Sequence, residues 1–282
     1  RNRLMLNQSA TLNVGIIGCG WLGSALAMEL LKNKANVVAS TTSATKQPLL
    51  RELGINTELL TLPCALSILT KLKIFRQQQL VICIPPQLKQ GKTNYQEKIA
   101  LLLEAAEQGN IKRIILISTT AVYRGLTGII TEQSVTDSHD EKVRQLIKAE
   151  QLVLHFSGAT TIIRLAGLVG ADRHPGRFLA GKTKLANANA RVNLIHQQDA
   201  VAIIIALLSQ PELTGIFNGV SKTKATRQQF YQQAAKVLNL TPPEFINKPM
   251  ATPLDKIISS DKIQHKLGYQ LVYADLFSYL CD

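Results

Sequence analysis

The sequence is poor in cysteine and has no long apolar run. Its 282 residues include 4 cysteines, and none of them form a C-x-x-C pair. We therefore expect neither a disulfide framework nor a metal site. The longest apolar run, residues 200–208, is far shorter than the roughly 18 residues that span a bilayer. The first six residues lack the apolar stretch of a secretory signal, so we expect a cytoplasmic protein.

Aromatic and acidic residues are also scarce. Aromatic side chains make up 5% of the chain, and 32 Lys and Arg outnumber 19 Asp and Glu, giving a net charge of +13. An excess of positive charge favours anionic partners. No basic run is interleaved with aromatic residues, which argues against a platform for single-stranded nucleic acid. A small phosphorylated molecule is the expected partner, and assembly as a homodimer stays open.

What the sequence does contain is an alternation of short apolar runs and helical patterns over its first 165 residues. Such alternation predicts a parallel sheet covered by helices on both faces. We therefore expect a doubly wound α/β domain of the Rossmann type over residues 1–165. The predicted strands are 12–17, 36–40, 80–84, 113–118 and 160–165, and the predicted helices are 24–31, 47–53, 95–108 and 143–155.

The pattern changes after residue 165. Residues 192–219 are expected to return to the first domain, whereas 166–191 and 220–282 are expected to form a smaller substrate-binding region. Asp199 stands at the start of a predicted helix, where an N-terminal cap explains it. The elements predicted in this part are a helix at 200–208, a strand at 215–219 and a helix at 221–238.

The first predicted strand runs directly into Gly18-Cys19-Gly20-Trp21-Leu22-Gly23, followed by a helix. This is G-x-G-x-x-G in the strand–turn–helix setting of dinucleotide-binding folds. The first glycine allows the tight turn, the second lets a pyrophosphate approach the backbone, and the third lets helix and strand pack closely. The helix N-terminus favours the phosphate charge. The alternative is a glycine-rich turn that binds nothing.

The end of the second strand bears on the choice of cofactor. NAD-binding folds place an acid there for the ribose 2′-hydroxyl, but this chain has Ser40-Thr41-Thr42-Ser43. Hydroxyl groups can hydrogen-bond a 2′-phosphate, whereas an acid would repel it. Lys46 is the nearest basic residue. The segment therefore favours NADP over NAD, and NAD remains the alternative.

Several blocks together carry a family resemblance. The chain resembles the extended or atypical short-chain dehydrogenase/reductases of the NAD-dependent epimerase/dehydratase type, and within them the YeeZ-like group. The resemblance implies an NAD(P)-dependent oxidoreductase, or an epimerase or dehydratase of nucleotide sugars, that acts on a small anionic substrate. The blocks are 18–23, 117–123, 164–170, 174–178, 181–183 and 192–200.

The resemblance also assigns catalytic positions. It implies that Thr119 polarises the substrate carbonyl or hydroxyl. The family's Y-x-x-x-K pair is absent, because its two positions fall near Lys142 and Leu146. Tyr123 and His139 are then the candidates for acid–base catalysis; the alternatives are a buried structural tyrosine and a solvated loop histidine. A non-catalytic dinucleotide sensor or scaffold is the alternative function.

Substrate contacts are expected from Arg173 and Arg177, because guanidinium groups bind phosphates in a bidentate manner. The alternative for this segment is a solvated loop. His196 is a third candidate for substrate binding, and the alternative is a structural role. The cofactor contacts expected from the motif and the resemblance are Gly18, Cys19, Gly20, Trp21, Leu22, Gly23, Ser40, Thr41, Thr42, Ile84, Pro85, Ser118, Leu165 and Ala166.

Overall fold

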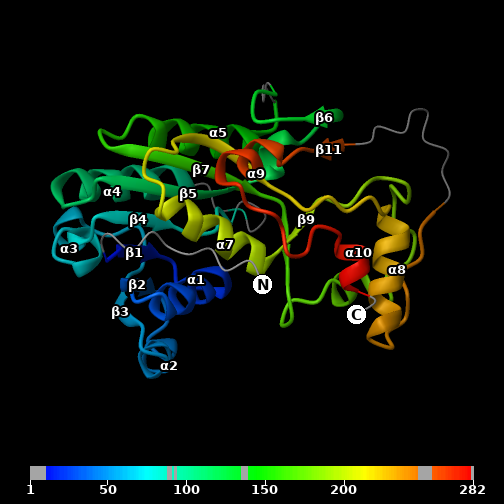
Figure 1. Cartoon of the computed structure of the whole chain (residues 1–282), viewed down its shortest axis with the longest axis horizontal. Coiled ribbons are helices and arrows are strands. Elements are labelled where there is room, and N and C mark those ends of the chain that lie inside the picture. Colours follow the sequence, from blue (N-terminus) through cyan, green and yellow to red (C-terminus); the bar gives the residue numbers. More distant parts are fainter. Residues whose placement is uncertain (1–10, 88–90, 92–93, 135–138, 247–255, 281–282) are drawn as a thin grey trace. The chain divides into compact units, whose positions relative to one another are not determined.

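The structure is a computed structural model that describes residues 11–87, 91, 94–134, 139–246 and 256–280 (Figure 1). The expectations for the first six residues and for Cys281 lie outside these ranges. No helix within them is long and apolar enough to cross a membrane. The described residues form two compact units: 11–118, 139–164 and 201–217 make up the first, and 119–134, 165–200 and 218–280 the second.

The first unit is built on a seven-stranded sheet with the strand order β10-β7-β5-β4-β1-β2-β3. The pairings of β1 with β2 and β4, of β2 with β3, and of β4 with β5 are all parallel. The order reverses between β1 and β4, which is where Rossmann folds bind their ligand. The strands are β1 (Asn13–Ile17), β2 (Asn36–Thr41), β3 (Asn56–Leu59), β4 (Gln79–Ile82), β5 (Arg113–Thr119), β7 (Ala159–Leu165) and β10 (Gly215–Gly219).

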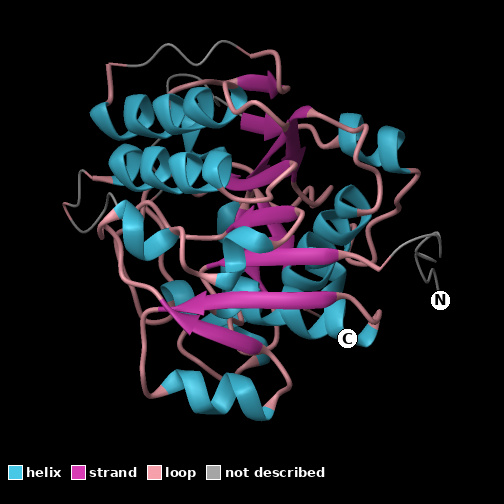
Figure 2. Ribbon diagram, turned by 90° about the vertical axis from the view of Figure 1, so that its left-hand side faces the viewer, coloured by secondary structure: helices cyan, strands magenta, loops and turns pink. Residues whose placement is uncertain are grey.

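Helices lie on both faces of this sheet (Figure 2). Both faces are covered because the central strands are apolar throughout: Ile16, Val81 and Ile115 are fully buried. This confirms the expected doubly wound α/β fold. The helices are α1 (Trp21–Lys32), α2 (Lys46–Glu52), α3 (Leu66–Leu69), η1 (Lys73–Arg76), α4 (Tyr95–Gln108), α5 (Glu141–Leu154) and most of α7 (Gln197–Leu208).

A buried ion pair joins three elements of the first unit. On α5, Glu150 is 2% exposed, and on β7, Arg164 is 4% exposed. The Arg164 Nη2 lies 2.6 Å from the Glu150 Oε2. From β5, the Ser118 hydroxyl donates to the Glu150 Oε1 over 2.5 Å. The carboxylate thus has both charge and hydrogen-bond partners, which a buried charge requires.

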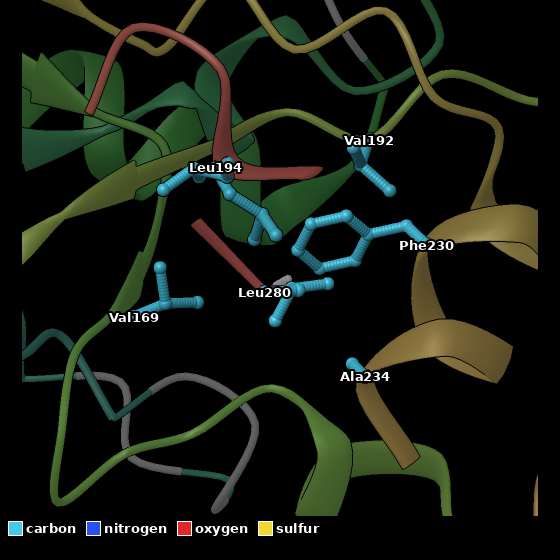
Figure 3. Packing of buried hydrophobic residues seen from close by; sticks show 7 residues of the cluster. Val169, Val192, Leu194, Phe230, Ala234 and Leu280 are labelled. Atoms are coloured by element: carbon cyan, nitrogen blue, oxygen red, sulfur yellow. The ribbon is translucent and has the colours of Figure 1, made fainter. Parts of the chain in front are cut away.

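The second unit is assembled from short elements around its own apolar core (Figure 3). It contains two small sheets of two parallel strands each, β6 with β11 and β8 with β9. The core residues are Val169, Val192, Leu194, Phe230, Ala234, Leu276 and Leu280. The elements are η3 (Thr120–Tyr123), β6 (Gly128–Ile130), β8 (Gly167–Val169), α6 (Gly176–Leu179), β9 (Leu194–His196), α8 (Arg227–Val237), β11 (Lys256–Ile258), α9 (Asp261–Leu267) and α10 (Leu276–Tyr279).

The helix predicted from residue 221 begins later, at Arg227. A capping box sets this start, because the Thr226 hydroxyl accepts from the backbone N–H of Gln229 and the Gln229 side chain accepts from Thr226. The preceding polar residues are used differently. The Thr223 hydroxyl accepts a hydrogen bond from the backbone of Leu276 over 2.8 Å, so this stretch binds the C-terminal segment and does not form a helical turn.

The cap predicted at Asp199 is also wrong. The helix α7 begins at Gln197, so Asp199 lies inside its first turn. Its fully buried carboxylate accepts hydrogen bonds from the Tyr269 hydroxyl (2.7 Å) and from the backbone N–H groups of Val272 (2.7 Å) and Tyr273 (2.9 Å). Asp199 therefore anchors the chain over residues 269–273.

Candidate functional site

The three glycines of the turn between β1 and α1 have different surroundings. Gly18 has φ +99°, a conformation that side chains rarely adopt. A Cβ on Gly23 would lie 2.2 Å from the Gly18 carbonyl oxygen, so only glycine allows this close packing. A Cβ on Gly20 would meet no atom within 4 Å. The space in front of Gly20 is thus open to a ligand.

Ser40, at the end of β2, fixes the shape of this turn. Its hydroxyl accepts a hydrogen bond from the Gly18 N–H over 3.0 Å. Its carbonyl accepts one from the Cys19 N–H over 2.7 Å. Beyond them, α1 starts without a side-chain cap and without an acidic residue in its first turn. Such a helix start suits an anion.

A cavity of about 460 Å³ opens at this turn. It lies at the carboxyl ends of the strands β1 to β4, the edge at which open α/β sheets bind ligands. Its volume is in the range of small-molecule sites. The lining residues are Ile17, Gly18, Cys19 and Gly20 at and after the end of β1, Ser40, Thr41, Thr42 and Ser43 at and after the end of β2, Lys46 on α2, Leu60, Thr61 and Leu62 after β3, Cys83, Ile84, Pro85 and Gln87 after β4, and Lys98 on α4.

The charges along the cavity fit an anionic ligand. Burial raises the pKa of the Cys19 thiol to about 11. Burial, with a smaller effect of Cys19, raises the pKa of the Cys83 thiol to about 12. Both thiols are therefore neutral at neutral pH. The described lining residues include the cations Lys46 and Lys98 but no carboxylate, so the cavity suits a dinucleotide diphosphate.

Most of the predicted cofactor residues of the first unit line this cavity, and some do not. Among the described residues, Trp21, Leu22 and Gly23 are not in its lining; they form the start of α1. Ser118 donates its hydroxyl to Glu150. Leu165 and Ala166 belong to the second unit and are 3% and 5% exposed. Four further lining residues were not predicted from the sequence: Thr61, Leu62, Gln87 and Lys98. The sequence indicated neither the strand β3 nor that the helix α4 borders the cavity.

Thr119 ends β5 and begins the short helix η3 in the second unit. Its hydroxyl oxygen accepts a hydrogen bond from the Ala121 N–H over 3.2 Å. A threonine hydroxyl has one proton to donate besides its acceptor positions. Thr119 is half-buried, and its hydroxyl lies at the carboxyl end of β5.

Tyr123, four residues further on, is fully buried. Its phenol donates a hydrogen bond to the Asn218 side-chain oxygen over 2.8 Å. The Asn218 amide in turn donates to the Ser259 carbonyl over 3.1 Å. In this arrangement the phenol ties segments of the second unit together, and it has no exposed surface from which to transfer a proton.

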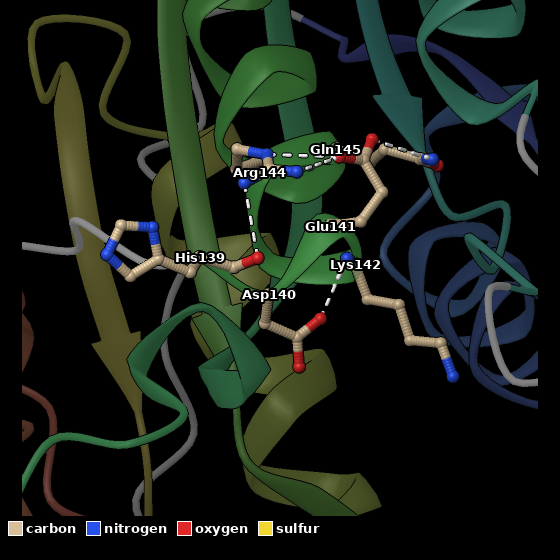
Figure 4. A network of polar contacts seen from close by, with 6 residues as sticks. All are labelled: His139, Asp140, Glu141, Lys142, Arg144 and Gln145. Atoms are coloured by element: carbon tan, nitrogen blue, oxygen red, sulfur yellow. Dashed lines mark hydrogen bonds and ion pairs between the residues drawn. The ribbon is translucent and has the colours of Figure 1, made fainter.

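His139 lies just before α5, in the first unit, whereas Thr119 and Tyr123 belong to the second. Its carbonyl accepts a hydrogen bond from Arg144 over 3.1 Å, while its exposed imidazole makes none of the contacts drawn in Figure 4. The next residue, Asp140, caps the helix by accepting from the Lys142 N–H over 2.8 Å. Lys142 is exposed and Leu146 is buried, so neither position supplies the missing tyrosine–lysine chemistry.

The predicted substrate residues all lie in the second unit. Arg173 and Arg177 are exposed, and the Arg173 guanidinium lies 6.0 Å from the centre of the Phe178 ring. His196 is 8% exposed, and its ring centre lies 3.8 Å from that of Tyr273. Burial lowers the pKa of His196, and the negative charge of Asp199 acts in the opposite direction to a smaller extent. Its Nδ1 accepts from the backbone of the following turn, over 3.2 Å, so the neutral imidazole carries its proton on Nε2.

Comparisons with known proteins agree with this fold. No family model matches the sequence. The enzyme WbmG of Bordetella bronchiseptica in complex with NAD and UDP superimposes with a TM-score of 0.76 at 16% identity, over 96% of this chain and 94% of WbmG. UDP-glucose 4-epimerase of Thermotoga maritima with UDP-glucose gives a TM-score of 0.76 at 13% identity, over 95% and 96% of the two chains. Both likenesses show the fold, which is that of the NAD-dependent epimerases and dehydratases.

The sequence comparison is more specific. Protein YeeZ of Escherichia coli (strain K12) is 35% identical to this chain over 268 residues. The alignment covers 93% of this chain and 96% of YeeZ. The chain belongs to the YeeZ family.

Proposed function

We propose that the chain binds a nicotinamide dinucleotide in the cavity of its first unit and uses it in oxidoreductase or epimerase-type chemistry on a small anionic substrate. The open space in front of Gly20 carries this proposal, since it lies where a dinucleotide pyrophosphate approaches the backbone. The two lysines and neutral thiols of the lining support it. The bound nicotinamide would supply hydride transfer.

NADP is the preferred cofactor in this proposal. The Ser40 hydroxyl is already bonded to Gly18, and the Ser43 hydroxyl is bonded to the Thr45 hydroxyl and to the Lys46 N–H. We therefore assign Thr42 and Lys46 to the 2′-phosphate. Thr42 and Lys46 are exposed. Their hydroxyl and ammonium groups donate hydrogen bonds that suit a phosphate.

A carboxylate at residue 42 tests this preference. We expect Thr42→Asp to raise the Kd for NADPH at least about tenfold, or about 1.4 kcal/mol, because the new charge repels the 2′-phosphate. The Kd for NADH should stay the same or fall. Isothermal calorimetry measures both. The uncharged Thr42→Asn is the matched control, and equal losses for both cofactors in Thr42→Asp would refute the assignment of these residues to the 2′-position.

Thr119 is the residue that we assign to the substrate. Its oxygen is fixed by the Ala121 N–H, so the hydroxyl proton can be directed at a substrate oxygen. Arg173 and Arg177 are cations of the same unit, and we assign them to an anionic part of the substrate, such as the diphosphate of a nucleotide sugar.

We expect Thr119→Ala to lower kcat at least about tenfold, in the range of general acid–base effects, with the Kd for NADPH unchanged. Thr119→Ser keeps the hydroxyl and should keep most of the rate. The measurement is NADPH oxidation with a panel of carbonyl compounds and nucleotide sugars. Full activity of Thr119→Ala on every substrate that the unaltered protein turns over would remove Thr119 from the reaction.

A non-catalytic dinucleotide sensor is the second candidate, and two observations favour it. The Tyr123 phenol is buried against Asn218, and the Y-x-x-x-K positions hold Lys142 and Leu146. In a sensor, NADPH would bind with the same dependence on residue 42, but no member of the substrate panel would be turned over. The two functions are therefore separated by the panel and not by the binding experiment.

A further inference from the structure

Lys98 occupies a position on α4 that the apolar pattern of the helix would give to a core residue. It lies three residues after Tyr95 and four residues before Leu102, which places the three side chains on one face of the helix. Tyr95 is 3% exposed and Leu102 is fully buried, so this face is directed to the interior of the first unit. Lys98 is half-buried and lines the cavity. A lysine stem lies along apolar surface while its ammonium reaches polar space, and the cavity is the polar space that Lys98 borders.

The segment between β4 and α4 brings no carboxylate to Lys98. Residues 83–96, which run from the end of β4 into the first turn of α4, contain no Asp or Glu. The described residues of the cavity lining contain none either. Glu97 is exposed, and consecutive residues of a helix do not face each other. A molecule in the cavity therefore meets the ammonium of Lys98 without a carboxylate of the lining beside it.

Lys98 borders the part of the cavity in which the base of a dinucleotide is expected. The 2′-phosphate that we assign to Thr42 and Lys46 belongs to the adenosine ribose, so the base on this ribose lies in the same half of the ligand. The lining after β3 is largely apolar there, since Leu60 is 6% exposed and Leu62 is half-buried. A flat purine ring suits such a wall.

We propose that Lys98 reads the purine base of the bound dinucleotide and makes the cavity accept a 6-oxo purine, hypoxanthine, at least as well as adenine. An ammonium has three N–H donors and no acceptor, so it bonds the O6 and N7 acceptors of a 6-oxo purine, as lysine does with guanine. Adenine carries a donor amine at position 6 instead. The neutral lining residues Thr61 and Gln87 both donate and accept, so they serve either base. This specificity rests on the proposed function, because it needs a dinucleotide in the cavity.

Two reduced dinucleotides that differ at position 6 of the base test this specificity. NADH and its deaminated analogue, reduced nicotinamide hypoxanthine dinucleotide, are titrated into the full chain freed of bound nucleotide, and calorimetry gives both Kd values. Neither carries a 2′-phosphate, so the comparison reports the base alone. We expect the Kd of the hypoxanthine analogue to be equal to or below that of NADH. A Kd about threefold or more above that of NADH would overturn the proposal.

Substitution of the two lysines of the lining gives the second test. Lys98→Met keeps the apolar stem and removes the ammonium, and it should weaken binding of the hypoxanthine analogue at least about tenfold, as for a lost hydrogen bond to a charged group. NADH should lose less. Lys46→Met is the matched control, because it removes the other lysine of the lining and should leave the ratio of the two Kd values unchanged. Equal losses for both nucleotides in Lys98→Met would show that Lys98 does not read the base.

The same titrations separate this specificity from the proposed function. Binding of NADH without binding of the hypoxanthine analogue would refute the role of Lys98 and leave the proposed function in place. Binding of neither nucleotide would refute both. The comparison on the unaltered protein decides the matter even if Lys98→Met does not fold.

Discussion

Replacing Gly20 by alanine is expected to abolish dinucleotide binding while the protein stays folded. The added methyl group meets no atom of the protein within 4 Å and would occupy the space of the pyrophosphate. We expect the Kd for NADPH to rise at least about 100-fold, or about 2.8 kcal/mol. The loss of folding stability should not exceed about 1 kcal/mol, the usual difference between glycine and alanine at a helix N-cap. Calorimetry and urea unfolding measure the two quantities.

Gly23→Ala is the matched control for this experiment, because it should show the opposite pattern. Its methyl group would lie 2.2 Å from the Gly18 carbonyl oxygen, so helix α1 must move away from the turn. We expect a clear loss of stability, of the order of about 1–3 kcal/mol for overpacking. Unchanged NADPH affinity in a folded Gly20→Ala protein would show that the ligand does not approach this turn.

The second large effect concerns the stability of the first unit. We expect Glu150→Gln to lower the free energy of unfolding by about 3–5 kcal/mol. The substitution leaves the charge of Arg164 buried without its carboxylate, since the side chains of Glu150 and Arg164 are only 3% and 5% exposed. Urea unfolding, followed by circular dichroism, measures the change.

Glu29→Gln is the control, because Glu29 and Lys32 form an ion pair on the surface of α1 with an N···O distance of 3.0 Å. Their side chains are 43% and 71% exposed, and such pairs contribute about 0–1 kcal/mol. Replacing both buried partners, as in Glu150→Met with Arg164→Met, should recover part of the loss. Equal effects of Glu150→Gln and Glu29→Gln would show that the buried pair does not stabilise the fold.

The parts of the fold that sequence reasoning predicts well are those with local signals. The helix 95–108 was predicted to the residue, since Gly109 follows its periodic apolar positions. The strand β1 is mostly apolar and is followed by Gly18, and β2 ends in Ser40 and Thr41, so the order of these strands along the chain and the glycine turn follow directly. The turn then forms one end of the cavity.

Other parts of the fold depend on tertiary contacts that no local sequence pattern indicates. The strand β3 has the sequence NTEL, which is partly polar and half exposed, so it gives no apolar run. Missing it hid the contribution of Leu60, Thr61 and Leu62 to the cavity. In the second unit, β6, β8, β9 and β11 are three residues long, too short for a periodic signal. Within this unit the Lys256 ammonium donates a hydrogen bond to the Tyr123 carbonyl over 2.9 Å, and because the two residues are 133 positions apart, their spacing in the sequence could not predict it.

The candidate catalytic residues show the same limit. The family resemblance gave Thr119 a position, and its hydroxyl geometry is suited to the role. Tyr123 was a candidate because it follows a strand end close to Thr119, and His139 because an imidazole can transfer protons near neutral pH. Whether a side chain is buried, and which unit it belongs to, depends on the tertiary structure and cannot be read from these local features. The phenol is inside the second unit, bonded to Asn218, and the imidazole is an exposed group of the first unit.

The central claim is that the turn at residues 18–23 holds the diphosphate of a nicotinamide nucleotide. It is tested most directly by titrating NADPH and NADH into protein freed of bound nucleotide, with binding followed by calorimetry. The account predicts one saturable class of sites, with NADPH bound more tightly than NADH. Absence of binding of either nucleotide at millimolar concentration would contradict it.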